Sequence, residues 1–94
     1  MNEMSLAVQI KQLNEMKSYL EGFCKELRQT VDEMRQQTLA LKGAGLPVEK
    51  ADDYLTKDLS VVDSGVEQVI KNITTQHIAF LDEVTNYLES ALKR

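Results

Sequence analysis

Ala40-Leu41-Lys42-Gly43-Ala44-Gly45-Leu46-Pro47 lies near the middle of a 94-residue chain and contains two of its four glycines and its one proline. Glycine readily takes the left-handed backbone conformation that ends a helix, and proline suits the first turn of the helix that follows. The segment therefore predicts a break between two helices, with a turn over residues 43–47.

Before this turn, a row of apolar residues predicts a long helix from about residue 5 to residue 42. The intervals alternate between four and three, which is the heptad pattern of helices that pack against other helices. Lys17 and Thr38 are the two residues that interrupt the row. The row consists of Leu6, Ile10, Leu13, Leu20, Cys24, Leu27, Val31, Met34 and Leu41.

After the turn, a similar row predicts a second helix from about residue 48 to residue 93. Between Ile73 and Leu81 the interval is four twice, a stutter that locally unwinds a coiled coil. The weak helix formers within residues 58–65 and at 74–75 are candidate positions for a bend. The row consists of Ala51, Leu55, Leu59, Val62, Val66, Val69, Ile73, His77, Leu81, Val84, Leu88 and Ala91.

A connection this short makes the two helices antiparallel neighbours. We therefore expect one all-α domain over residues 1–94, an antiparallel two-helix hairpin of the coiled-coil type. Folding about residue 45 places Leu27 near Val62 and Ile10 near Phe80.

Six further apolar residues flank the two rows. Two helices give each other only one packing face, so we expect these residues to be exposed in a monomer. Pairing with itself or with a related hairpin would complete a four-helix bundle and cover them. These candidate partner-binding residues are Met16, Phe23, Val61, Ile70, Phe80 and Tyr87.

Charge and hydropathy exclude several classes of partner. The net charge is −4, and basic and acidic residues are interspersed, so no positive stripe is available to neutralise phosphates. No apolar run approaches the roughly 18 residues that a bilayer span needs, and no Sec-type signal is seen at the N-terminus. We expect neither nucleic-acid binding nor membrane insertion.

Catalytic and metal-binding patterns are also missing from the sequence. His77 is the one histidine and Cys24 the one cysteine, so a histidine cluster or an internal disulfide cannot form. Cys24 falls at an apolar helical position, which predicts a small buried thiol. We expect no enzymatic activity, no cofactor and no metal.

The turn nevertheless suggests a family. Leu41-Lys42-Gly43 stands at the same place in a helical hairpin as the turn signature of LXG domains from type VII secreted toxins and of the small WXG-type hairpin proteins. Leu20-Glu21-Gly22-Phe23-Cys24 and Lys50-Ala51-Asp52-Asp53-Tyr54-Leu55 also resemble LXG sequences. LXG domains are normally about twice this length, and the tryptophan of the WXG turn is absent.

The resemblance implies a function and an export signal. In these families the signal is an aromatic residue followed four positions later by an acid, and Tyr54 and Asp58 match it. It implies a protein that is cytoplasmic before export, is secreted without a Sec signal, and partners a larger LXG-type toxin or another small hairpin. The alternative from a different class is a cytosolic coiled-coil module or secretion chaperone that is not itself exported.

Overall fold

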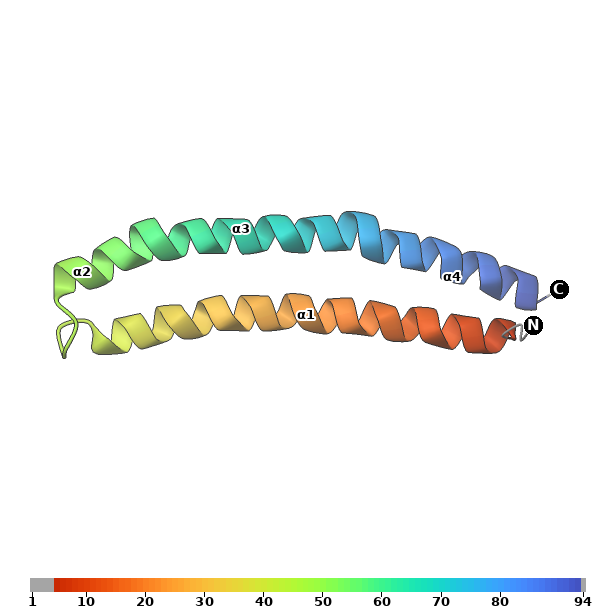
Figure 1. Ribbon diagram of the computed structural model, residues 1–94, viewed down its shortest axis with the longest axis horizontal. Coiled ribbons are helices and arrows are strands. Elements are labelled where there is room, and N and C mark those ends of the chain that lie inside the picture. The colour runs from red at the N-terminus through yellow and green to blue at the C-terminus, as the bar shows by residue number, and fades with distance from the viewer. Residues whose placement is uncertain (1–4, 94) are drawn as a thin grey trace. The chain divides into compact units, whose positions relative to one another are not determined.

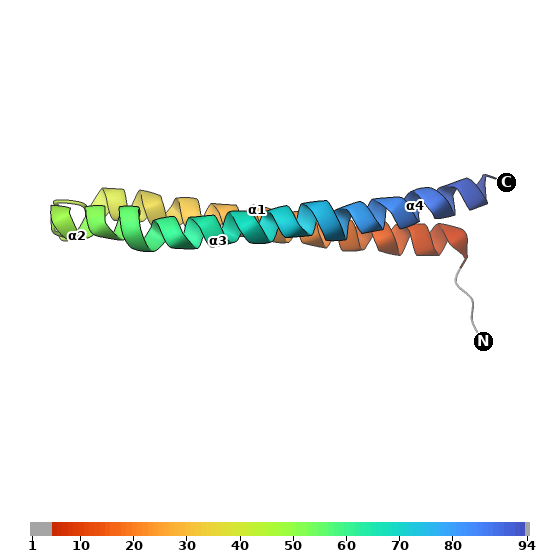
Figure 2. The ribbon, with the colours of Figure 1, turned by 90° about the horizontal axis from the view of Figure 1, so that it is seen from above.

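The computed structural model describes residues 5–93, which form a helical hairpin (Figures 1 and 2). The first arm is α1 (Leu6–Leu41). The second arm runs back antiparallel and is helical throughout, which confirms the predicted all-α hairpin. It consists of α2 (Val48–Asp53), the π-helical segment η1 (Tyr54–Asp58), α3 (Leu59–Asn72), the π-helical segment η2 (Ile73–Ile78) and α4 (Ala79–Leu92).

The ends of α1 are fixed by a side-chain cap and by the glycine turn. The Val8 amide donates a hydrogen bond of 3.2 Å to Ser5 Oγ, which satisfies one of the free donors at the helix start. At the other end Gly43 has a φ of 78°, the left-handed conformation predicted for it. The amides of Ala44 and Leu46 donate to the Leu41 carbonyl at 2.9 and 3.0 Å. The turn therefore satisfies the exposed carbonyl at the end of α1 before α2 begins.

The hairpin comprises two compact units, and α1 passes through both. Unit 1 contains residues up to 23 and residues from 71 onward, and unit 2 contains residues 24–70. In each unit, side chains from the two arms meet along a line that we call the seam. The most buried seam residues are Ile73, Leu81 and Thr85 in unit 1, and Cys24, Val31, Thr38, Ala51, Leu59 and Ile70 in unit 2.

In α1 the inward-facing residues depart from the predicted row after Val31. Arg35 and Lys42 are partly buried there, whereas Met34 and Leu41 are exposed. A straight α-helix drifts by about 20° per heptad, so over five heptads the inward position moves by about one residue. The prediction that Met34 and Leu41 lie in the seam is therefore wrong.

The same displacement occurs in the second arm. Asp63 and Ile70 face inward, whereas Val62 and Val69 are exposed. A π-helical turn holds about one residue more than an α-helical turn, and η1 lies directly before this part of the arm. The predicted partner-binding residue Ile70 is only 5% exposed, so its assignment to a free surface is wrong.

The pairing of the two arms in unit 1 also differs from the predicted one. A fold that placed Ile10 near Phe80 would put Lys17 opposite Ile73, but Lys17 Nζ lies 2.9 Å from Asp82 Oδ1. The difference of nine residues corresponds to roughly 13 Å of α-helix, more than a lysine side chain can span. Part of this difference arises at the turn, where Lys42 pairs with Asp52 although folding about residue 45 would put it opposite Val48. The wider turns of η1 and η2 add to it, and in η2 Ile78 rather than His77 faces inward.

The backbone at Gly43 provides a test of the turn. Gly43→Ala is expected to lower the free energy of unfolding by about 1–2 kcal/mol, because a Cβ is strained in the left-handed conformation. Urea unfolding followed by circular dichroism at fixed protein concentration measures this change.

Gly22→Ala is the matched control, since Gly22 lies within α1 and an added Cβ meets no atom within 4 Å. It is expected to raise stability by up to about 1 kcal/mol. Equal unfolding midpoints for Gly43→Ala and the wild type would contradict the assigned turn.

Candidate partner-binding surface

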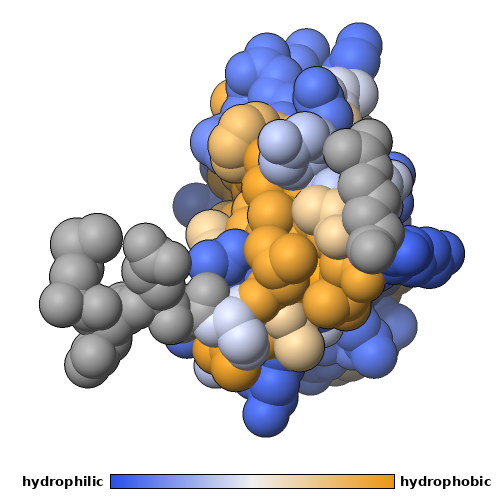
Figure 3. Space-filling view, turned by 90° about the vertical axis from the view of Figure 1, so that its right-hand side faces the viewer, coloured by the Kyte–Doolittle hydropathy of each residue, from blue (hydrophilic) through white to orange (hydrophobic). Residues whose placement is uncertain are grey.

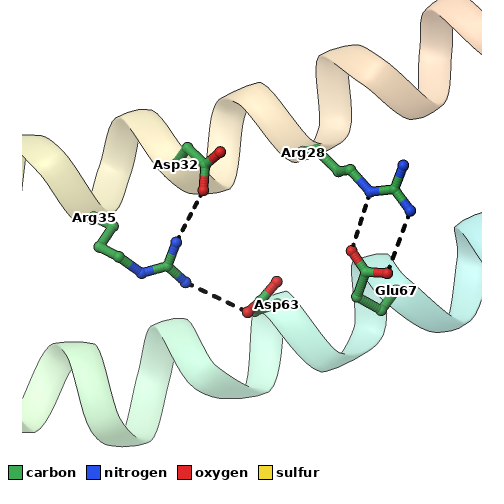
Figure 4. A network of polar contacts seen from close by, with 5 residues as sticks. All are labelled: Arg28, Asp32, Arg35, Asp63 and Glu67. Atoms are coloured by element: carbon green, nitrogen blue, oxygen red, sulfur yellow. Dashed lines mark hydrogen bonds and ion pairs between the residues drawn. The ribbon is translucent and has the colours of Figure 1, made fainter.

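Ion pairs join the two arms in both units. In unit 1, Lys17 pairs with Asp82 at 2.9 Å. In unit 2, Arg28 Nε lies 3.3 Å from Glu67 Oε1, and a second contact of 3.5 Å makes the pair bidentate (Figure 4). Two further pairs join the arms in unit 2, Arg35 with Asp63 at 3.4 Å and Lys42 with Asp52.

These contacts favour the charged forms of two basic groups. The hydrogen bond that Lys17 donates to Asp82, followed by the charge of Asp82, raises the pKa of Lys17 above the ordinary 10.5. The hydrogen bond with Glu67, followed by its charge, raises the pKa of Arg28. Because these groups remain partly exposed to water, the pairs serve mainly to align the arms.

The ion pairs define one side of the seam. Arg28 follows the inward residue Leu27 in sequence, and Asp82 follows the inward residue Leu81. A helix turns by about 100° per residue, so residues that follow an inward residue point to one side. We call this the charged side, and in α1 it also carries Lys11, Glu21, Lys25 and Asp32.

The opposite side is apolar and exposed. Eight large hydrophobic residues each stand directly before an inward residue, and in each unit they form two pairs seven residues apart. We call these sets the apolar edge of unit 1 and the apolar edge of unit 2. The first comprises Met16 and Phe23 of α1 with Phe80 and Tyr87 of α4, and the second comprises Met34 and Leu41 of α1 with Val62 and Val69 of α3.

Antiparallel packing brings both arms of a unit into the same edge. Viewed from one end of the pair, successive side chains advance clockwise in one arm and anticlockwise in the other, because the two chains run in opposite directions. The two arms also face each other, so their inward directions are opposite, and the two reversals cancel. Residues that precede an inward residue therefore point to the same side in both arms. Each edge is consequently a two-helix surface.

Charged residues are few on this side of α1, α3 and α4, whereas in α2 and η1 the charged Lys50 and Asp58 directly precede the buried Ala51 and Leu59. Within α1, Glu26 is the one charged residue that directly precedes an inward residue. Within α3, the corresponding residues are Val62, Gly65, Val69 and Asn72, none of which is charged. Depletion of charge together with apolar side chains at a seven-residue interval is typical of a helix-packing surface.

The edge of unit 1 is aromatic. Phe80 is 61% exposed and Tyr87 is 73% exposed, and Tyr19, which precedes the inward Leu20, extends the set. Figure 3 views the end where α1 begins and α4 ends, and hydrophobic residues there form a central band between hydrophilic ones. Exposed aromatic side chains are common energetic anchors of protein interfaces.

The predicted surface residues are thus largely brought together, with two exceptions. Met16, Phe23, Phe80 and Tyr87 share the apolar edge of unit 1. Val61 is 73% exposed but stands one position before Val62, on the outer side of α3, and Ile70 is buried. The heptad pattern places all four residues of the apolar edge of unit 2 in the seam, so it does not predict this edge. A shift of the inward position by one residue along each helix would predict it.

The predicted turn and export residues lie apart from this surface. Leu41 ends α1 and belongs to the apolar edge of unit 2, and Gly43 forms the turn. Tyr54 begins η1 and is half-buried, whereas Asp58 ends η1 and is exposed. The two predicted export residues therefore frame one π-helical segment, a feature that often occurs at functional sites.

Within residues 5–93, no three side chains of His, Cys, Asp or Glu gather to hold a metal ion. Cys24 is a free, buried thiol, as its position predicts, and His77 is exposed. None of the helices in this range is long and apolar enough to cross a bilayer.

Comparison with protein-family models, curated proteins and solved structures found no match to this chain.

The ion pair in unit 1 predicts a dependence of stability on pH. Because the pKa of Lys17 is raised in the folded chain, its stabilising contribution is complete below about pH 10 and is lost as the pH rises past 10.5. Wild type is expected to lose more thermal stability between pH 8 and pH 11 than Lys17→Met, whose apolar side chain suits the seam. Lys11→Met, at an exposed position of α1, serves as the control, and equal losses in wild type and Lys17→Met would contradict the role of the pair.

Proposed function

We propose that the protein is a helical partner protein of a type VII secretion system, which acts by packing its apolar edges against another helical protein. The observation that supports this function best is the set of eight exposed hydrophobic residues, aligned in pairs seven residues apart on a side of α1, α3 and α4 with few charged residues. Scattered surface hydrophobic residues are normal, but an aligned set marks a contact surface.

The energetics favour association over a lone hairpin. Full burial of one large apolar side chain stabilises by roughly 1.5–3 kcal/mol, and eight such residues are at least two-fifths exposed here. Association loses roughly 4–15 kcal/mol in translational and rotational freedom. Because these side chains are about half exposed, covering both edges gains roughly 6–13 kcal/mol, which is of the same order as the loss, whereas the gain from covering a single residue is not.

The link to secretion comes from the resemblance at the turn and from Tyr54 and Asp58. Leu41-Lys42-Gly43 occupies the hairpin turn, where LXG and WXG-type proteins carry their signature. In this proposal the partner is an LXG-type toxin or another small hairpin, the complex assembles in the cytoplasm, and the face around η1 is presented to the secretion machinery.

The apolar edge can be tested in the native host. Phe80→Glu places a charge in the centre of the aromatic edge and is expected to weaken co-purification of the helical partner at least about 30-fold, as expected for an interface anchor. Asn86→Glu is the matched control, because Asn86 follows the buried Thr85 and lies on the charged side of the same helix. Equal recovery of the partner with both variants would contradict the proposed surface.

The export signal is tested separately. Tyr54→Ala and Asp58→Ala are each expected to abolish secretion into the medium while the helix content stays as in wild type, and Thr56→Ala, in the same segment, is expected to be secreted normally. Normal export of the first two variants would remove the signal. A chain that stays in the cytosol while its partner is secreted would instead indicate the chaperone alternative.

A further inference from the structure

We propose that α3 has two packed arrangements in unit 2, related by a rotation about its own axis, and that the rotation exposes or covers Val62 and Val69. In the observed arrangement both valines are exposed and two ion pairs join α3 to α1. In the rotated arrangement the valines lie in the seam and the ion pairs are released. The role of this rotation in partner binding rests on the proposed function, since it concerns the availability of the same surface.

Two rows of residues that could face inward overlap on α3. Those that face inward in the structure are Leu59, Asp63, Val66 and Ile70, and the sequence also contains the apolar row Leu59, Val62, Val66 and Val69. The rows share Leu59 and Val66 and differ by one residue at the other two places. One residue corresponds to about 100° around a helix, so the mean inward directions of the two rows differ by only about 50°.

The two arrangements bury similar apolar area. Val62 and Val69 are 53% and 45% exposed in the observed arrangement, and the rotation covers them. In exchange Ile70, which is 5% exposed, moves to the margin of the seam, and the carboxylate of Asp63 moves further into water. Two packings with nearly balanced burial are the condition under which one chain populates both.

The ion pairs favour the observed arrangement. Arg28 with Glu67 and Arg35 with Asp63 join α1 to α3 on the charged side (Figure 4). Turning the valines inward carries Glu67 and Asp63 around α3 and away from α1. This movement leaves Arg35 paired, because Arg35 also contacts Asp32 of its own helix at 3.0 Å. Since both pairs are partly exposed to water, they hold α3 only weakly.

The backbone before α3 provides for the rotation. The Leu59 amide donates to the Tyr54 carbonyl, five residues back, which is the π-helical pattern of η1. A π-helical turn that tightens to an α-helical turn rotates the helix after it by up to about 100°, twice what is needed. Residues 58–65 contain Asp, Ser and Gly, which are weak helix formers, so the hydrogen bonds of this stretch rearrange at small cost.

The rotation regulates access to the apolar edge of unit 2. A partner that packs against this edge binds only the arrangement in which Val62 and Val69 are exposed. Its apparent affinity falls in proportion to the fraction of chains in the rotated arrangement. The ion pairs on one side of the seam therefore control the apolar surface on the other side.

The test is the alkylation of single cysteines by iodoacetamide in the purified full chain carrying Cys24→Ala. Ile70→Cys reports the rotated arrangement, because residue 70 is buried in the observed one, and Val69→Cys reports the observed arrangement. Raising NaCl from about 0.01 to 1 M shortens the screening length from roughly 30 to 3 Å and so weakens the ion pairs. The ratio of the rate at residue 70 to the rate at residue 69 is expected to rise at least about threefold.

Substitutions test the same balance at low salt. Glu67→Gln is expected to raise the ratio as high salt does, whereas Glu33→Gln is the matched control, because Glu33 bonds Gln37 within α1. Val62→Ser is expected to lower the rate at residue 70 at least about threefold, because the rotated arrangement loses a buried valine. In a chain with one fixed packing, a change at the exposed Val62 would not protect residue 70. Circular dichroism checks that the helices persist in each variant.

The outcomes separate this inference from the proposed function. A ratio that either NaCl or Glu67→Gln leaves unchanged, or a rate at residue 70 that Val62→Ser does not lower, overturns the rotation. If the chain still recovers a helical protein from the host in a Phe80-dependent manner, the proposed function stands without it. A ratio that shifts as expected in a chain that recovers no partner supports the rotation and contradicts the proposed function.

Discussion

Two helices can bury only one narrow stripe of each other, and the rest of this structure depends on that limit. The α-helix advances by 3.6 residues per turn, whereas the apolar row repeats every 3.5, so the stripe that faces the partner arm drifts across the sequence. Arg35 and Lys42 occupy inward positions that a strict heptad assigns to Met34 and Leu41. Met34 and Leu41 therefore stay exposed, and they contribute to the apolar edge of unit 2.

The polar residues in the seam fix the alignment of the two arms, which apolar residues alone would not specify. Lys17 and Thr38 interrupt the apolar row of α1, yet both face inward. Thr38 satisfies its hydroxyl by donating to the Met34 carbonyl at 2.7 Å, and Lys17 selects Asp82 on the opposite arm. A uniform apolar row would allow the arms to slide by a turn, whereas a specific ion pair favours one alignment.

The fold was predictable from the sequence because its signals are local. Gly43 and Gly45 mark the turn, and the apolar rows on either side identify the arms. The individual surface residues were less predictable, because their exposure depends on phase. Phe80 and Tyr87 kept their predicted exposure since the seam through Leu81 and Leu88 kept its phase, whereas Ile70 moved inward after the wider turn of η1. The apolar row has two successive intervals of four from Ala51 to Leu59 and again from Ile73 to Leu81, where η1 and η2 lie, but such a stutter does not by itself distinguish an unwound coiled coil from a π-helical turn.

The burial of Cys24 gives the molecule an internal reporter. It is the one thiol in the chain and lies in the seam with 6% of its surface exposed. A thiol in this position reacts with an alkylating reagent only while the arms are apart, so its labelling rate records how often unit 2 opens. The alkylation rate of Cys24 in the unmodified protein thus measures local opening of unit 2, and any molecule that holds the arms together should lower this rate.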